Sequence, residues 1–496
     1  MKLKNTFYLS IGTITSRIVG FLRDILIASY FGTSYLTDAF YAAFQIPSLF
    51  RRILGEEMYE RAIMPIYKNL YVKDQQTGQF YLKKILILVI IMSFLGTLII
   101  FPFLKILIHY LYPGFNKQTF TLTYNLALIL LPFIFFISLG TFISAFLLYE
   151  KKYIIYSFAP VLINIIVILS ILIFGKQISI SAISIGYTCG SFIFFTIQIP
   201  FYYILYKNKS IKTNTKTINN KLLKESYNST KNNSFQIFVS SLINKSVEIV
   251  DKFVASLLST GSITYLYYSF RIIQLPFAII SLAVSRTTAT ELINLNNDKQ
   301  KIKYYIQKGF NINLIILIPI IIFSIIFRNE IIAILFKRGN FNDNSVSNTA
   351  FAFAFYLPGL LPMGLNSILL RIFSNFEKNK IPLITSAIGG ILNIILNFLL
   401  YKTFLKHAGI ALATSISFTV QFFILKKYLD KKIISIEYKY IIKKFIIISL
   451  ISSIFLLYKF IFNIIPINNF FIKFLLISSI SFLNYIMILK FIYKKL

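Results

Sequence analysis

Residues 85–110 read ILILVIIMSFLGTLIIFPFLKILIHY, an apolar run that carries a single lysine, Lys105. About 20 consecutive apolar residues are needed for a helix to cross the hydrocarbon core of a bilayer, so this run is long enough to span a membrane. Fourteen apolar runs approach or exceed that length, at residues 7–31, 35–50, 85–110, 120–149, 153–174, 178–206, 233–258, 262–284, 309–327, 345–370, 381–401, 408–425, 445–465 and 468–489. The sequence therefore predicts an all-α integral membrane protein with about 14 transmembrane helices.

The composition and the placement of charge agree with this class. Of the 496 residues, 57% are hydrophobic and 14% are charged, which excludes a soluble enzyme and a disordered chain. The net charge of +34 would suggest a nucleic-acid partner in a soluble protein, but here the basic residues lie in short loops between apolar runs. With a cytoplasmic N-terminus, 36 of the 51 Lys and Arg fall in cytoplasmic loops and termini and 10 in the opposite loops and edges. This asymmetry predicts that both termini are cytoplasmic, and we expect no nucleic-acid partner.

Several kinds of chemistry are excluded by residue content. A single cysteine, Cys189, rules out a disulfide within the chain, and His109 and His407 do not form a transition-metal pattern. The chain contains no GxxxxGK[ST] loop, GxSxG elbow or HExxH helix. We therefore expect a transporter and not an enzyme, driven by an ion gradient or the membrane potential.

Three short matches at a nearly constant offset indicate an internal repeat. Asp24-Ile25-Leu26-Ile27-Ala28-Ser29 aligns with Asp251-Lys252-Phe253-Val254-Ala255-Ser256 at an offset of 227, and Gln45-Ile46-Pro47 with Gln274-Leu275-Pro276 and Asn164-Ile165-Ile166 with Asn393-Ile394-Ile395 at 229. With six spans per copy, both copies have the same orientation in the membrane. We expect an N-terminal six-helix lobe at residues 1–206, a polar cytoplasmic linker at 207–232, a C-terminal six-helix lobe at 233–430, and two additional helices at 431–496.

Ionisable residues inside the apolar runs are the most informative side chains, because a charge in lipid costs several kcal/mol unless it meets water, a partner or a substrate. Nine lie in the first, second, seventh and eighth runs: Arg17, Arg23, Asp24, Asp38, Lys245, Glu248, Asp251, Lys252 and Arg271. They form either structural ion pairs between packed helices or a hydrated cationic chamber. Lys245, Glu248 and Lys252 are expected to form local pairs. The planar guanidinium binds phosphate or carboxylate oxygens bidentately, so Arg17, Arg23 and Arg271, with Arg51 at the end of the second run, could bind an anionic head group.

Asn393 and Asn397 are four residues apart, so their amides project from one face of the eleventh span. Such a pair commonly forms hydrogen bonds between membrane helices. Together with Asp251 and the hydroxyl of Thr414, the two amides would also supply the hard oxygen ligands that a small cation prefers. The sequence leaves both interpretations open.

Specific stretches of the chain are similar to a known family. They are Ser16-Arg17-Ile18-Val19-Gly20-Phe21-Leu22-Arg23-Asp24, Phe31-Gly32, Thr37-Asp38-Ala39-Phe40, Ala43-Phe44-Gln45-Ile46-Pro47-Ser48-Leu49-Phe50-Arg51-Arg52, Pro113-Gly114-Phe115, Tyr267-Tyr268-Ser269-Phe270-Arg271-Ile272-Ile273-Gln274-Leu275-Pro276, Leu335-Phe336-Lys337-Arg338-Gly339-Asn340-Phe341 and Lys380-Ile381-Pro382. These stretches, spread over most of residues 5–430, resemble the MurJ (MviN) family of lipid II flippases.

The resemblance implies a fold of the multidrug/oligosaccharidyl-lipid/polysaccharide (MOP) exporter superfamily, which is MATE-like, with two lobes around a cationic cavity. It implies a protein of the bacterial cytoplasmic (inner) membrane that moves lipid II, the undecaprenyl-diphosphate-linked disaccharide-pentapeptide, to the periplasmic leaflet by alternating access. Its implied partners are lipid II, membrane lipid and proteins of cell-wall synthesis. The implied site residues are Arg17, Arg23, Arg51 and Arg271, with Asp24 and Asp38, for the head group, and Asp251, Asn393, Asn397 and Thr414 for a coupling sodium ion. The last two helices would form a groove for the polyprenyl tail.

Other functions remain open at this point. A polysaccharide-lipid exporter would also carry a polyprenyl diphosphate, whereas a cation-coupled MATE-type drug antiporter would more often have an apolar or acidic cavity. A membrane enzyme or scaffold that binds such lipids is the alternative from a different class. The repeat and the lack of a catalytic constellation argue against it.

Overall fold

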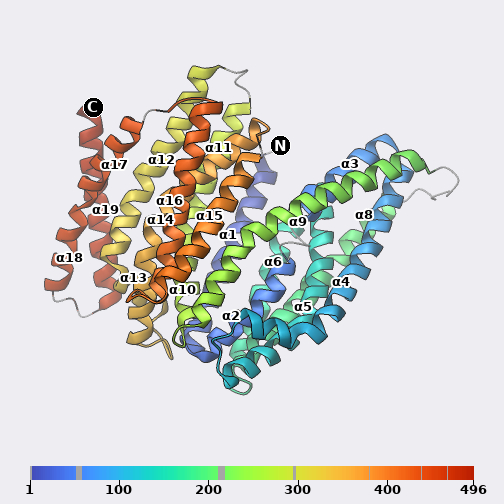
Figure 1. Ribbon diagram of the computed structural model, residues 1–496, viewed down its shortest axis with the longest axis horizontal. Helices are drawn as coiled ribbons and strands as arrows, with labels where there is room; N and C mark the ends of the chain where they lie inside the picture. The colour runs from blue at the N-terminus through green and yellow to red at the C-terminus, as the bar shows by residue number, and fades with distance from the viewer. Residues whose placement is uncertain are drawn as a thin grey trace. The chain divides into compact units, whose positions relative to one another are not determined.

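A computed structural model of the chain describes residues 3–51, 58–209, 218–293, 298–378, 380–436, 438–465, 467 and 469–495. These residues are almost entirely helical, and no strand occurs among them (Figure 1). The predicted all-α membrane class is therefore confirmed. Tertiary contacts divide the chain into two compact units, unit 1 (Met1–Gly261) and unit 2 (Ser262–Leu496).

Unit 1 contains nine α-helices and one π-helical turn in its described residues. These are α1 (Leu3–Phe31), α2 (Tyr35–Phe50), the turn η2 (Tyr59–Ile63), α3 (Met64–Lys73), α4 (Gln75–Leu111), α5 (Lys117–Tyr149), α6 (Tyr153–Phe174), α7 (Ser181–Thr196), α8 (Ile199–Lys209) and α9 (Asn220–Ser256). Helix α5 lies at the centre of unit 1, because it packs against α2, α4 and α7.

Unit 2 is built in the same way around one long central helix. Its elements are α10 (Ser262–Pro276), the π-helical turn η4 (Phe277–Ser281), α11 (Leu282–Ile293), α12 (Lys299–Ile326), α13 (Arg328–Phe336), α14 (Asp343–Asn375), α15 (Lys380–Leu400), α16 (His407–Lys432), α17 (Tyr438–Ser452), α18 (Ile454–Ile464) and α19 (Phe470–Lys495). Helix α14 packs against α10, α12 and α16, and α17 packs against α12.

Within the described residues, eleven stretches are long and apolar enough to cross a membrane. They coincide with eleven of the fourteen predicted spans. The other three predicted spans are helices α1, α2 and α9. Helix α2 has 16 residues, and α1 and α9 carry the ionisable side chains that the sequence singled out. The three helices that are least typical of a membrane are therefore those that carry most of the candidate site.

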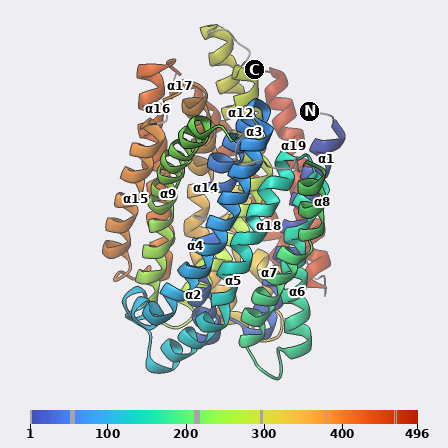
Figure 2. The same cartoon turned by 90° about the vertical axis from the view of Figure 1, so that its right-hand side faces the viewer.

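Part of the predicted polar linker, residues 207–232, is helical. Helix α9 begins at Asn220, while residues 210–217 lie outside the described part of the chain. The first turns of α9 run alongside α3 and α4 (Figure 2). There Leu222, Leu223 and Tyr227 pack against a buried cluster that includes Tyr67. Because α9 belongs to unit 1 by its contacts, the lobe boundary at 233, which derives from the repeat, stays a prediction.

The two additional helices predicted at 431–496 correspond to three helices, α17, α18 and α19. Phenylalanine rings join α18 and α19 to the end of α12, since Phe323 contacts Phe455, Phe474 and Phe482 at centroid distances of 5.3, 6.0 and 5.0 Å. A salt bridge between Lys459 of α18 and Glu330 of α13 lies beside this cluster.

Candidate functional site

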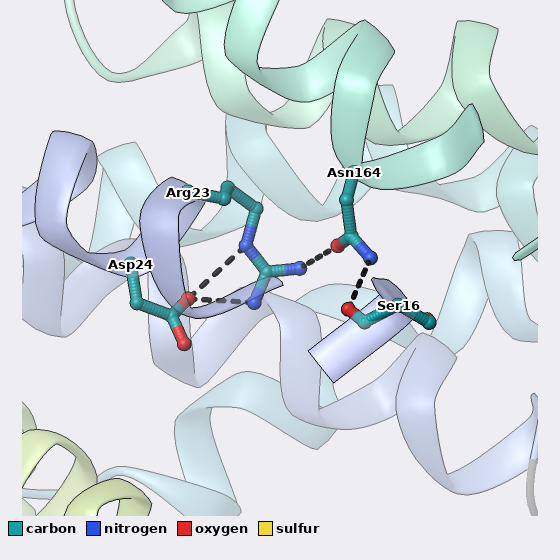
Figure 3. A network of polar contacts seen from close by, with 4 residues as sticks. All are labelled: Ser16, Arg23, Asp24 and Asn164. Atoms are coloured by element: carbon teal, nitrogen blue, oxygen red, sulfur yellow. Dashed lines mark hydrogen bonds and ion pairs between the residues drawn. The ribbon is translucent and has the colours of Figure 1, made fainter. Parts of the chain in front are cut away.

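Arg23 and Asp24 form a buried ion pair on α1 (Figure 3). The Nε and Nη2 atoms of Arg23 donate to Oδ1 of Asp24 at 3.1 and 2.6 Å. Arg23 is 7% exposed and Asp24 is fully buried. The two opposite charges neutralise each other on a largely apolar helix. This pairing lowers the free-energy cost of burying either charge.

Two further side chains fix the guanidinium against other helices of unit 1. Nη1 of Arg23 donates to Oδ1 of Asn164 on α6 at 2.7 Å, and the Asn164 amide donates in turn to the carbonyl of Ser16 at 3.5 Å (Figure 3). The guanidinium carbon lies 5.3 Å from the ring centroid of Tyr187 on α7, within the range of a cation–π contact. Arg23 therefore ties α1 to α6 and α7, which is a structural role.

Arg17 and Arg51 occupy different environments from Arg23. Arg17 is exposed on α1, and six residues place it about 120° around the helix from Arg23. Arg51 is half-buried where α2 ends and the chain enters residues 52–57, which lie outside the described part. Unit 1 therefore presents one buried guanidinium and two that are accessible to different degrees.

Asp38 lies in the first turn of α2 and is 4% exposed. Its Oδ2 accepts a hydrogen bond from the backbone N–H of Gly261 at 2.5 Å, which holds the turn after α9 against α2. Gly261 has φ 95°, a conformation that favours glycine. A small polar cavity beside the carboxylate is lined by Asp38, Gly114, Phe115, Asn116, Thr119, Ala255, Ser256, Leu258, Ser259 and Thr260.

On α9, Lys245 forms a salt bridge with Glu248, which confirms the expected local pair. Lys252 behaves differently. Its ammonium donates to the Tyr41 carbonyl at 3.1 Å and to Oε1 of Gln45, so it crosses to α2. A lysine that was expected to pair on its own helix instead links two helices of unit 1. Asp251, the neighbouring residue, is half-buried.

In unit 2, Asn393 and Asn397 of α15 meet Thr414 of α16. Nδ2 of Asn397 donates to Oδ1 of Asn393 at 3.0 Å, and Nδ2 of Asn393 donates to the Thr414 hydroxyl at 3.1 Å. Asn393 is 1% exposed, Asn397 is 0% exposed and Thr414 is 6% exposed. Their amide and hydroxyl oxygens are hard, neutral ligands, which fit a small monovalent cation. Arg271 of α10 is half-buried in the same unit.

The structure thus brings together Arg23 with Asp24, and Asn393 with Asn397 and Thr414. Arg23, Lys252 and Asp38 also have partners that were not predicted as site residues. Asn164 and Gln45 could have been found, because both belong to stretches that recur in the repeat. The aromatic partner Tyr187 and the backbone partner Gly261 follow from helix packing, for which the sequence gives no signal.

Comparisons with known proteins agree with one another. The family model for lipid II flippase MurJ matches residues 27–478. A probable lipid II flippase MurJ of Buchnera aphidicola subsp. Schizaphis graminum is 32% identical, over 99% of this chain and 96% of that protein. Its counterpart in Rickettsia prowazekii is 29% identical, over 85% of this chain and 82% of that protein.

Solved structures give the same result at the level of the fold. A lipid II flippase MurJ in an inward closed conformation superposes with a TM-score of 0.83 and 25% identity, over 98% of this chain and 99% of that chain. An inward-facing multidrug MATE transporter of the MOP superfamily has a TM-score of 0.68 at 14% identity, over 86% of this chain and 98% of that chain. This second likeness concerns the fold alone.

Proposed function

The chain belongs to the MurJ family of lipid II flippases, and we propose that it moves lipid II from the cytoplasmic to the periplasmic leaflet by alternating access. The observation that carries the proposal is the family match over residues 27–478, which covers most of both copies of the repeat. The buried polar groups of both units support a transporter, because charges in membrane helices usually mark a substrate or ion path. No covalent bond is made or broken in this process.

The diphosphate of lipid II requires cationic ligands, and we propose that Arg17, Arg23, Arg51 and Arg271 supply them. Carboxylate and phosphate oxygens bind the same edges of a guanidinium. The diphosphate therefore competes with Asp24 for Arg23, and Asp24 re-forms the pair when the head group leaves. In this proposal Asp38 is an acceptor for the head group and also fixes the turn at Gly261.

A sodium ion as the coupling ion would be held in unit 2 by the oxygens of Asn393, Asn397 and Thr414. Asp251, which the resemblance adds to this set, belongs to unit 1. The repeat supports this proposal. It pairs Asp24 with Asp251 and Asn164 with Asn393, and in the first copy the guanidinium of Arg23 binds both the Asp and the Asn. The position that corresponds to Arg23 in the second copy is Val250, an uncharged residue. A cation in the second copy would therefore come from solution.

The orientation and partners also belong to the proposal. The distribution of lysine and arginine supports cytoplasmic termini in the bacterial inner membrane. On the periplasmic side, lipid II would pass to the enzymes that build the cell wall. The MATE transporters share the fold at 14–15% identity, which favours neither drug export nor polysaccharide-lipid export for this chain.

The proposal is tested by depleting the protein in its own cells and treating them with a periplasmic enzyme that cleaves lipid II. We expect uncleaved lipid II to accumulate as the protein disappears, because the substrate remains in the cytoplasmic leaflet. Re-expression of the chain is the control and should restore cleavage. Unchanged cleavage after depletion would contradict the proposed substrate.

A further inference from the structure

The interface of α14, α15 and α16 in unit 2 contains polar side chains beyond the Asn393 cluster. Ser417 and Gln421 follow Thr414 at three and seven residues, so all three share one face of α16. Nε2 of Gln421 donates to the Ser386 hydroxyl of α15 at 3.1 Å. Oε1 of Gln421 accepts from Nδ2 of Asn366 on α14 at 3.2 Å. A second polar cluster therefore lies about 10 Å along α15 from the first.

Two oxygens in this cluster are buried without a hydrogen-bond partner among the described residues, namely Oδ1 of Asn366 and Oγ of Ser417. Asn366 is 3% exposed and Ser417 is 6% exposed. Turning the Asn366 amide over does not solve the problem, because its Nδ2 already donates to the Phe418 carbonyl at 2.9 Å as well as to Gln421. Buried polar atoms in membrane proteins are almost always satisfied, so these two oxygens point to a bound species.

The interface also has room beside Ser417. A Cβ added to Gly389 of α15 would lie 3.8 Å from the Ser417 carbonyl and 3.8 Å from Cβ of Gln421, which is ordinary van der Waals contact. At Gly359, by contrast, the added atom would lie 2.7 Å from the hydroxyl of Ser415. The helices therefore leave space for a methyl group between Gly389 and the Ser417 and Gln421 turn of α16.

The chemistry of the cluster selects the ligand. Its oxygens come from two amides and two hydroxyls, all of them neutral. Divalent ions are usually bound through carboxylates, whereas neutral carbonyl and hydroxyl oxygens are sufficient for sodium. The nearby Lys426 pairs with Asp430 on the same helix, so its charge is balanced.

We propose that Ser386, Asn366, Ser417 and Gln421 form a second sodium site in unit 2. It lies on the N-terminal side of Asn393 along α15, which is the cytoplasmic side if both termini are cytoplasmic. A sodium ion moves between this site and the Asn393 cluster. The inference rests on the proposed sodium coupling, but its test measures occupancy by a cation and not flipping of lipid II.

The experiment uses the full chain in lipid vesicles, with Cys189→Ser as the background and Ser417→Cys as the reporter. Silver ion is the probe, because it is a small monovalent cation that caps thiols. We expect the new thiol to be capped, and sodium to slow capping about tenfold relative to choline when sodium is present at ten times its Kd for the reporter variant. Thiols that escape capping are counted with a maleimide after unfolding.

Ser452→Cys in the same background is the matched control. Ser452 is fully buried on α17 and its hydroxyl already donates to the Ile448 carbonyl at 2.7 Å, so its thiol should resist silver. If Ser417→Cys does not fold, Ser386→Cys replaces it. A reporter thiol that is not capped, or is capped equally fast in sodium and choline, overturns the site. If sodium protects the reporter thiol in vesicles that do not flip lipid II, the sodium site is supported and the proposed flippase function is contradicted.

Discussion

At the scale of single residues, the charge of Arg23 is balanced inside unit 1 by Asp24, with Asn164 as a third member. Removing one partner of a buried ion pair costs about 3–5 kcal/mol, whereas replacing both with apolar side chains is often neutral. We therefore expect Arg23→Met to lower the free energy of unfolding by about that amount, and Arg23→Met/Asp24→Leu to recover most of it. Chemical unfolding in detergent measures both variants.

The same two variants separate stability from substrate binding. If the diphosphate binds Arg23, the double variant should be nearly as stable as the parent chain and still fail to flip lipid II. Flipping at the parent rate by the double variant would show that Arg23 is structural and binds no substrate.

Arg23 and Asp24 were predictable as important residues, because a charge in an apolar membrane helix is costly unless it has a partner or a function. The repeat singles out Asn164 but does not identify it as the partner of Arg23, because it lies 141 residues away and is brought close by the packing of α6 on α1. For the same reason, the sequence could predict that Lys252 needs a partner but not that Gln45 would be the partner.

At the scale of elements, the start of α4 depends on a cap. The carboxylate of Asp74 accepts from the backbone N–H groups of Gln76 and Thr77 at 3.0 and 3.2 Å and from the Thr77 hydroxyl at 2.5 Å. The Thr77 hydroxyl bond, followed by the backbone bonds, lowers the pKa of Asp74 below its ordinary value. A lowered folded-state pKa means that the cap stabilises the protein above about pH 4 and loses this effect as the pH falls further.

Asp74→Ala should therefore lower stability by about 1 kcal/mol at neutral pH. The difference from the parent chain should shrink below about pH 4, where the carboxylate becomes protonated. Asp74→Asn is the matched control, because an amide oxygen caps without titrating. Thermal unfolding from pH 3 to 7 measures all three chains, and a difference that does not vary with pH would contradict the assignment.

The first turns of α9 give a second prediction for an element. The hydroxyls of Tyr81 and Thr230 lie 2.6 Å apart in a buried contact that joins α4 to α9. Thr230→Val leaves the Tyr81 hydroxyl without this partner, at a cost of about 1–3 kcal/mol. We expect faster hydrogen exchange in residues 220–232, while Ser229→Ala on the exposed face should leave exchange unchanged. Equal exchange in the two variants would contradict the contact.

That these residues are helical was not predictable from hydropathy, because 207–232 is a polar stretch. The first turns of α9 are stabilised by the packing of Leu222, Leu223 and Tyr227 on other helices, because most helical stability in proteins comes from such packing. The apolar spans, in contrast, were predictable, since a helix is the structure that satisfies its own backbone in lipid.

At the scale of the whole molecule, the fold followed from the count of apolar runs and from the family stretches, which occur in both units. The sequence could not predict which of the four arginines are accessible. Arg23 is buried and paired, Arg51 and Arg271 are half-buried, and Arg17 is exposed. Exposure depends on how the helices pack, and it decides which arginines a substrate can reach.

This difference leads to a prediction about transport. Arg17 is exposed on α1, so alanine there should lower the stability of the chain far less than a substitution of the buried Arg23. Each hydrogen bond to a charged group contributes about 1.5–3 kcal/mol, so losing a bidentate contact with the diphosphate should slow flipping about 100-fold or more. Arg271→Ala should have a similar effect. The measurement is cleavage of lipid II by an external enzyme in vesicles that contain each variant.

The control is Arg286→Ala, since Arg286 is an exposed arginine of α11 that the proposal does not assign to the substrate. It should flip lipid II at the parent rate, with equal insertion into the membrane for all variants. Arg17→Lys distinguishes charge from geometry, because an ammonium keeps the charge but cannot bind two oxygens in the planar arrangement of a guanidinium. A rate between those of the parent chain and Arg17→Ala would indicate a bidentate contact, whereas parent rates in both Arg17→Ala and Arg271→Ala would rule out the arginine site and leave Arg23 with its structural role.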